Sequence, residues 1–424
     1  MLRILSILTF ALLLTTCKKG DETSPTSEIF EPNAMTVFSY NENITVKGQV
    51  TDETGLKSVK IQLIGMDGSA TEFSYENEIA GNSYLVNKTF TLDDRHLPSG
   101  QYIIKLTAID QANNTKSNYR EITYYELPLA LEDIFLVSHS NSFAYDLSKV
   151  DGSATQSVYT FSGDFQDMLA NSYWEQLMLS GGSSGNLISF DPINLVFNWE
   201  KAPQPTALPF YRKMYQLPSD KGVYVAQGNN TAVSYDKSGA KQRTLSMIAP
   251  KQSYQICESG EYVLVEERSI SQTYLSVYYK STGFLKHQFN ITGNIVKMLP
   301  KTDNEIYLIT NSGTISELFI YYVEDNYTYE PHGIDPGQTY DACLVSSNEI
   351  FIAHDNGIFK YTYDNNSMIN TIAELSEQLE YDYLNDRIVT KGTNEIKFYD
   401  RLGNPGGTVT HSSLIDKFVL YYNK

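Results

Sequence analysis

The six histidines are the first side chains in this sequence that could carry chemistry, because imidazole binds metals and transfers protons near neutral pH. None of them has the H-x-H or H-E-x-x-H spacing of a zinc site. His139 and His354 nevertheless occupy equivalent hairpins of an internal repeat described below, so they could approach each other across a ring. They are candidate ligand-binding residues or simply polar strand ends, and we expect no metal site.

Residues Gly181 to Gly185 match the G-x-S-x-G pattern of serine hydrolases. That pattern has catalytic meaning only on a strand-to-helix turn with a histidine that activates the serine. Here strand-like residues stand on both sides, so we predict a loop between two strands. No glycine-rich phosphate-binding motif opens a helix anywhere in the chain, and we expect no cofactor.

Paired carboxylates are harder to interpret. Glycoside hydrolysis needs two carboxyl groups at a defined separation. Acids recur in what we interpret as connections between repeats: Glu258, Glu261, Asp303, Glu305, Glu349 and Asp386. Acids are also common turn residues in a chain with 50 Asp and Glu, 32 Lys and Arg and a net charge of −18. We therefore predict no catalytic residues. The same charge repels phosphate backbones, so we expect no nucleic-acid partner.

Aromatic side chains suggest a binding surface. Both tryptophans, Trp174 and Trp199, fall in one repeat together with Tyr173, and a proline-containing insertion in that repeat ends near Tyr211. Aromatic rings stack on sugar faces and anchor protein contacts. We take these four residues as candidate ligand-binding residues, the alternative being core packing in an enlarged repeat.

The elements that must position these residues are strands. The chain has 424 residues, 41% of them apolar, and 32 are tyrosines, which favour strands. An apolar strand recurs seven times, beginning at Ile134, Gln176, Val223, Tyr262, Ile306, Ile350 and Arg387. Each is followed by a second strand that ends in an aromatic residue, at Tyr145, Phe190, Tyr235, Tyr279, Tyr322, Tyr363 and Tyr399. The spacing of 36 to 45 residues resembles that of β-propellers, and it predicts seven four-stranded blades over residues 131–424.

Period-two alternation over residues 31–127, as at Ile44, Val46 and Val50, predicts half-buried antiparallel strands. The stretch from Gly48 to Val59, with that from Gly100 to Asp110, resembles bacterial Ig-like β-sandwich domains, which commonly serve as spacers. Oxygen ligands for Ca²⁺ could meet at one end of this unit, or they could be turn residues: Asp52, Glu53, Asp110 and Asn113. The two cysteines Cys257 and Cys343 could pair. They occupy the same place in two repeats, however, so we predict buried free thiols in outer strands.

The N-terminus resembles a bacterial lipoprotein leader. A basic residue, Arg3, precedes an apolar run that is too short to span a bilayer, and Leu14 to Cys17 looks like a lipobox. The resemblance, which extends to Bacteroidetes-type lipoproteins, implies a signal peptide over residues 1–16, lipidation of Cys17 and a tether over residues 17–30. It also implies attachment to the outer membrane, with the surface and the periplasm both open.

The sequence thus predicts an all-β envelope lipoprotein with an Ig-like domain and a propeller. We expect a non-catalytic binding or scaffold role whose ligand is a glycan or a partner protein. The competing hypothesis is a propeller glycoside hydrolase or polysaccharide lyase.

Overall fold

The computed structural model describes residues 21–141, 144–206 and 209–424, which form 36 strands and one 3-10 helix, η1 (Ser172–Trp174). The chain divides into two compact units, Met1–Pro128 and Leu129–Lys424. The prediction of an all-β protein is confirmed. In the described part of the chain, no helix has the length and apolar character needed to cross a membrane.

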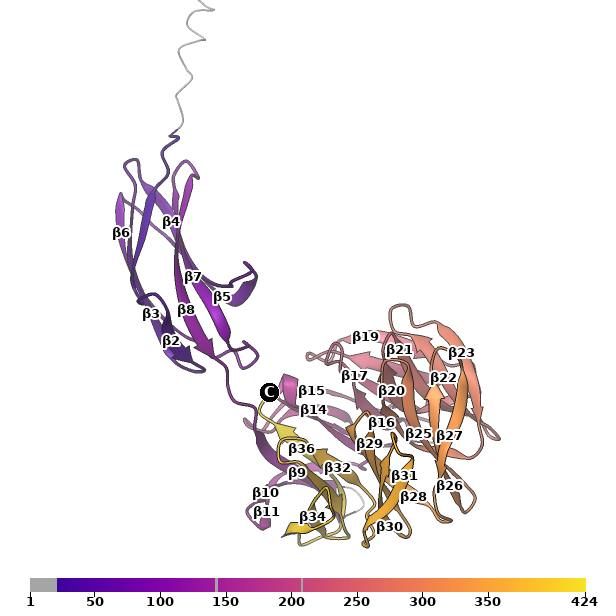
Figure 1. Ribbon diagram of the computed structural model, residues 1–424. Coiled ribbons are helices and arrows are strands. Elements are labelled where there is room, and N and C mark those ends of the chain that lie inside the picture. The colour runs from indigo at the N-terminus through magenta and orange to yellow at the C-terminus, as the bar shows by residue number, and fades with distance from the viewer. Residues whose placement is uncertain (1–20, 142–143, 207–208) are drawn as a thin grey trace, which may run out of the picture. The chain divides into compact units, whose positions relative to one another are not determined.

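The N-terminal unit contains two sheets around one core. The strands are β1 (Thr26–Glu31), β2 (Thr36–Ser39), β3 (Asn43–Thr51), β4 (Leu56–Gly65), β5 (Ala70–Glu78), β6 (Ser83–Thr91), β7 (Gly100–Asp110) and β8 (Thr115–Tyr125). One sheet has the order β1-β3-β6 and the other β2-β8-β7-β4-β5 (Figure 1). Apolar residues of both sheets, such as Ile44, Ile61 and Leu106, share one buried cluster, as their alternation predicted. β1 takes in residues that we expected in the tether.

The C-terminal unit consists of seven four-stranded antiparallel sheets. The first contains β9 (Leu131–Asn141), β10 (Ala144–Asp151), β11 (Ala154–Ser162) and β36 (Ile415–Tyr422). The others are formed in chain order by β12 (Asp167–Asn171), β13 (Gln176–Ser180), β14 (Leu187–Asp191) and β15 (Val196–Lys201); β16 (Tyr211–Gln216), β17 (Val223–Gln227), β18 (Thr231–Tyr235) and β19 (Lys241–Ser246); β20 (Gln252–Ser259), β21 (Tyr262–Arg268), β22 (Thr273–Tyr279) and β23 (Leu285–Ile291); β24 (Asn294–Pro300), β25 (Glu305–Ser312), β26 (Ile315–Tyr322) and β27 (Tyr327–Gly333); β28 (Thr339–Ser346), β29 (Glu349–His354), β30 (Gly357–Thr362) and β31 (Ser367–Ile372); β32 (Leu379–Asp382), β33 (Arg387–Lys391), β34 (Glu395–Asp400) and β35 (Pro405–Thr410).

These sheets have the arrangement of a β-propeller. Seven strands make up its inner circuit, in the order β36, β12, β16, β20, β24, β28 and β32, and each contacts the next. The circuit closes because β32 contacts β36 again. A feature that the repeat did not predict completes the first sheet: β36 pairs with β9, from Ile415 opposite Ser138 to Tyr422 opposite Leu131 (Figure 1). This pairing covers the sheet edge that would otherwise stay open.

The core of the propeller lies between neighbouring sheets. The second strand of each sheet is almost entirely buried, as in β13, β17 and β29. Apolar clusters join adjacent sheets, for example Val225 with Met178 and Ile306 with Leu264. These second strands are the apolar runs that recur in the sequence, so the repeat predicted the framework of the unit correctly.

Candidate functional site

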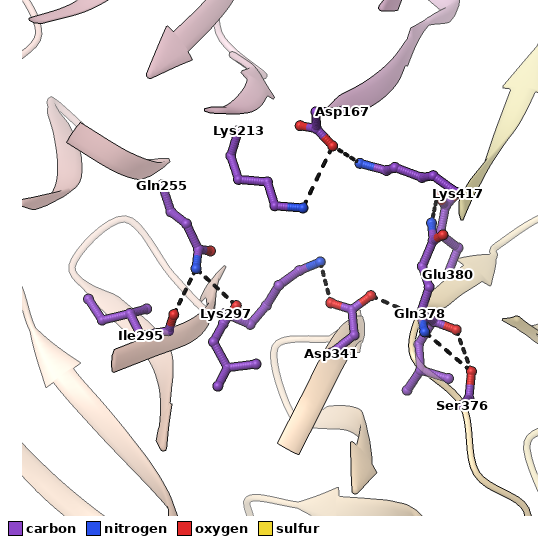
Figure 2. Close-up of polar contacts among 12 residues, drawn as sticks. Asp167, Lys213, Gln255, Ile295, Lys297, Asp341, Ser376, Gln378, Glu380 and Lys417 are labelled. Carbon is purple, nitrogen blue, oxygen red and sulfur yellow. Dashed lines mark hydrogen bonds and ion pairs between the residues drawn. The ribbon is translucent and has the colours of Figure 1, made fainter. Parts of the chain in front are cut away.

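A cavity of about 600 Å³ lies at the centre of the propeller and is lined by residues of all seven inner strands. We call it the central channel. Eight polar side chains from these strands, or from the residue just before one, form its channel ring: Asp167, Lys213, Gln255, Lys297, Asp341, Gln378, Glu380 and Lys417. Every inner strand contributes at least one of these side chains, and Figure 2 shows them arranged around a common centre.

Several ring side chains bond to the backbone of the next inner strand. The amide N–H of Met214 donates to Asp167 Oδ2 at 2.8 Å, and that of Leu379 donates to Asp341 Oδ2 at 3.0 Å. Gln255 Nε2 donates to the carbonyl of Ile295 at 2.8 Å. An inner strand has a hydrogen-bonded neighbour on one side only, so these bonds satisfy backbone groups on its other edge.

Gln378 and Glu380 make the same kind of contact with β36. The amide N–H of Phe418 donates to Gln378 Oε1 at 3.0 Å, and Gln378 Nε2 donates to the Phe418 carbonyl at 2.7 Å. The amide N–H of Leu420 donates to Glu380 Oε2 at 3.1 Å. The ring therefore positions the closing strand as well as lining the channel.

The acids of the ring are matched by lysines. Asp167 is 1% exposed and forms ion pairs with Lys417 and, at 3.7 Å, with Lys213. Burial acts to raise the pKa of Asp167, but the two ammonium groups outweigh it and hold the pKa below the usual value. Lys297 Nζ lies 2.7 Å from Asp341 Oδ1, and this carboxylate raises the pKa of Lys297 against the opposing effect of burial. Both acid groups are thus charge-compensated.

Glu380 differs from the two aspartates. Burial raises its pKa to about 7, against the opposing effect of the Leu420 amide and of Lys417 and Lys297. Its Oε1 accepts a hydrogen bond from Gln378 Nε2 at 3.1 Å. A carboxyl group that is partly protonated near neutral pH is the one member of the ring suited to proton transfer.

Among the ring residues, the three lysines are more exposed than the two aspartates, and the cavity is also lined by Glu377, which is 73% exposed and pairs with Lys391. The side chains of Lys213, Lys297 and Lys417 are 52%, 35% and 23% exposed, whereas those of Asp167 and Asp341 are 1% and 13% exposed. Each ammonium group has three N–H donors, and the ion pairs leave some of them unused. The channel therefore offers donors to a ligand that is rich in oxygen acceptors.

The two predicted histidines lie in different sheets, with the sheet of β32 to β35 between them. His139 Nδ1 pairs with Asp416 Oδ2 at 2.5 Å, and burial raises the pKa of that carboxyl group. His354 is fully buried, with its ring edge-on to Phe359. Among the described residues, neither histidine belongs to a cluster of three potential metal ligands.

Three of the four predicted aromatic residues belong to one apolar cluster, and none of the four lines the central channel. Tyr211 is a buried member of the cluster, and Trp174 and Trp199 pack against it. Trp199 Nε1 donates to the Lys237 carbonyl at 3.0 Å, and the Tyr211 hydroxyl donates to the carbonyls of Lys201 and Ala202. Tyr173 is 40% exposed. A role for these four residues in ligand binding stays a prediction.

The G-x-S-x-G segment is the predicted loop, between β13 and β14. The carboxylate of Asp164 accepts the backbone N–H groups of Ser183, Ser184 and Gly185 at 2.8, 2.9 and 2.6 Å. Glycine is required at Gly181 because a Cβ there would lie 2.2 Å from the Cα of Gly185. Asp164 already occupies the backbone N–H groups of this loop, and the strand β14, not a helix, follows the loop. The serines therefore lack the surroundings of a hydrolase nucleophile.

The acids considered from sequence stand in or beside turns within single sheets, and not between repeats as we predicted. Several are paired: Glu258 with Lys280 at 2.7 Å, and Glu349 with Arg401 at 2.9 Å. Cys257 and Cys343 are buried free thiols, as predicted. They lie in β20 and β28, however, which are inner strands, so their predicted placement in outer strands is wrong. Inner strands carry too many polar residues to be recognised from hydrophobicity alone.

Two of the four candidate calcium ligands come together in the N-terminal unit. Asp52 and Asp110 lie with Asp21 so that one carboxylate oxygen of each is within 4.8 Å of the others. Asn113 instead accepts a hydrogen bond from Lys57 Nζ at 2.6 Å. Asp52 Oδ1 is occupied by the N–H groups of Thr54 and Gly55, which is the role of a turn residue.

No protein-family model matches this sequence. No curated protein matches it either. Among solved structures, a functionally unknown protein from Desulfotomaculum acetoxidans is similar with a TM-score of 0.52 and 11% identity, over 68% of this chain and 98% of that one. At this identity the likeness shows a common fold and nothing about function.

Two further solved structures have lower scores. The Pan2 WD40 domain of Neurospora crassa has a TM-score of 0.48 and 14% identity, over 61% of this chain and 82% of that one. A quinoprotein alcohol dehydrogenase-like protein from Bacteroides thetaiotaomicron has a TM-score of 0.47 and 10% identity, over 93% of this chain and 99% of that one. The propeller assignment rests on the closed circuit of inner strands and does not depend on these two.

Proposed function

We propose that this protein is a cell-envelope lipoprotein that binds a glycan in the central channel without cleaving it. The observation that carries the proposal is the uneven exposure of the channel ring: its lysines are open, while its two aspartates are nearly closed off by lysines and backbone N–H groups. A sugar chain offers many oxygen acceptors and fits a donor-rich polar cavity.

The envelope location rests on the lipoprotein-like leader. Cys17, its proposed lipidation site, lies outside the described residues. Two sheets around one core support the proposal that the N-terminal unit is an Ig-like spacer between the outer membrane and the propeller. A partner protein of the envelope remains the other ligand class that this arrangement would serve.

The test is binding of a glycan array and soluble polysaccharides by the chain from residue 18 onward, with released reducing ends measured in parallel. Lys213→Ala removes the most exposed ring lysine, and we expect affinity to fall about tenfold through the lost charge-assisted hydrogen bonds. Lys241→Ala, on the outermost strand β19, is the matched control and should bind normally. Binding that is equal in both variants would contradict the channel as the site, and no glycan binding at all would favour a protein ligand.

A second candidate function, polysaccharide cleavage, is favoured by one observation: the pKa of Glu380 is raised, while lysines hold the pKa of Asp167, in the same ring, below its usual value. Carboxyl groups whose environments push their pKa values apart are typical of glycosidase sites. Release of reducing ends that disappears in Glu380→Gln would replace the binding proposal with this one. The absence of product from every polysaccharide bound would exclude it for those substrates.

A further inference from the structure

A second cavity, of about 220 Å³, adjoins the channel and shares Lys213 and Gln255 with it. Its other lining residues are Gln166, Pro209, Arg212, Tyr254 and Arg268. We call it the guanidinium pocket. It contains two arginines and a lysine, and no acid is among its lining residues.

Tyr254 lies between the two arginines and defines the pocket. The Cζ atom of Arg212 is 3.6 Å from the centre of the Tyr254 ring, and that of Arg268 is 4.1 Å from it. The face of an aromatic ring attracts a cation, and a planar guanidinium group stacks well on it. The ring therefore holds both groups in fixed orientations without neutralising either charge.

Arg212 has no acidic partner. The residue is 5% exposed, and no carboxylate of the described residues lies within ion-pair distance of its guanidinium group. One nitrogen, Nη2, donates to the side-chain oxygen of Gln252, while the buried Nε has no hydrogen-bond partner. Burying a charge without a counterion costs free energy, so a protein that retains this arrangement gains when an anion enters.

Arg268, in the same pocket, differs from Arg212 because it has an acidic partner. Its Nε pairs with Glu266 Oε1 at 2.6 Å, and Glu266 is fully buried. The Arg268 charge is thus compensated by the protein itself. The Arg212 charge and the exposed ammonium group of Lys213 are the cationic groups that face an incoming ligand.

We propose that the guanidinium pocket binds the carboxylate of an acidic sugar residue, a hexuronate, in the glycan that fills the channel. This inference rests on the proposed function. A guanidinium fork matches the planar carboxylate in geometry. Pro209 and the edge of the Tyr254 ring, whose faces the two arginines cover, give the pocket apolar walls, which suit the carbon ring of a sugar better than a bare inorganic anion.

The experiment compares three probes by titration calorimetry: an oligogalacturonate, the same oligosaccharide with its carboxyl groups reduced, and a sulfated neutral oligosaccharide. The natural chain should bind the uronate at least about tenfold more tightly than the reduced form. Arg212→Gln should abolish that preference by lowering the affinity for the uronate to about that for the reduced form. Arg243→Gln, at a half-buried arginine of β19 that pairs with Asp220, is the matched control and should keep the preference.

Two further measurements keep the outcome decisive. Tyr254→Leu removes the stacking and should also lower uronate affinity, with the folded state checked by circular dichroism. Equal binding of uronate and reduced forms would overturn the carboxylate pocket and leave the glycan proposal intact, and a preference for the sulfated probe would overturn the choice of carboxylate. If no oligosaccharide binds, the glycan proposal fails. In that case the pocket is tested with free galacturonate by NMR. Chemical-shift changes that are lost in Arg212→Gln would support the pocket, and the absence of any change would overturn it.

Discussion

The channel ring and the guanidinium pocket share Lys213, but they differ in whether buried charges have a counterion within the protein. In the ring, buried Asp167 is held by Lys417 and Lys213, and Asp341 by Lys297, so the protein supplies its own counterions. In the pocket, Arg212 is just as deeply buried and has no carboxylate partner in the described chain.

The difference separates structural charge from charge reserved for a ligand. The aspartates of the ring accept hydrogen bonds from backbone N–H groups of the next inner strand, so they stabilise the contacts between neighbouring sheets. Arg212 makes a side-chain contact with Gln252 and stacks on Tyr254, but it connects no backbone across the circuit. Changes to the buried ring acids or to Lys417 should therefore cost mainly stability, while changes to Arg212 should cost mainly binding.

The largest effect is expected for Lys417→Met. This change leaves Asp167, which is 1% exposed, with only the more distant Lys213. Removing one partner of a buried ion pair leaves an uncompensated charge, and we expect the free energy of unfolding to fall by about 3–5 kcal/mol. Urea denaturation at pH 7 measures the loss. A fall below about 1 kcal/mol, the range of exposed ion pairs, would show that the ring carries no structural charge.

The next effect is a change in pH dependence in Glu380→Gln. Burial raises the pKa of Glu380 from 4.5 to about 7, so the folded state holds a proton that the unfolded state has released. As pH rises from about 4.5 to 7, the natural chain should therefore lose stability through this group, by on the order of 3 kcal/mol. The Gln variant lacks this group, so it should match the natural chain near pH 5 and exceed it near pH 8. Thermal melts across this range test the prediction, and parallel curves would contradict it.

The smallest effect on stability is expected for Arg212→Gln. The variant loses the contact with Gln252 and the stacking on Tyr254, but it also removes a buried charge without a counterion. These terms oppose each other, so we expect the free energy of unfolding to change by less than about 1 kcal/mol. A loss as large as that of Lys417→Met, under the same urea protocol, would mean that Arg212 is structural.

Much of the fold could be predicted because the buried strands are the most regular part of the sequence. The runs at Val223 and Ile350 are wholly buried second strands, and their spacing predicted seven sheets. Inner strands such as β24 and β36 were not assigned because a lysine that lines the channel, Lys297 or Lys417, interrupts the apolar residues of each. The pairing of β36 with β9 joins segments far apart in the chain, and no local pattern records such a pairing.

The candidate site was less predictable. The ring residues recur with the repeat, at intervals of about 40 residues, but the repeated feature is a position and not a residue type. Lys213, Gln255 and Asp341 occupy equivalent places in their strands with different chemistry. No sequence pattern distinguishes Arg212, which directly follows Tyr211, and its lack of an acidic partner becomes visible only when every neighbouring strand is in place.

The pairing of β36 with β9 also sets a condition on biosynthesis. Until the ribosome has made the chain through Tyr422, β9 lacks one neighbour and the first sheet keeps an exposed edge. The ends that must meet are separated by nearly the whole unit, so ring closure is slow and comes last. Before β36 is made, that edge is free to pair with strands of other chains, so we expect the incomplete C-terminal unit to aggregate more readily than the finished one.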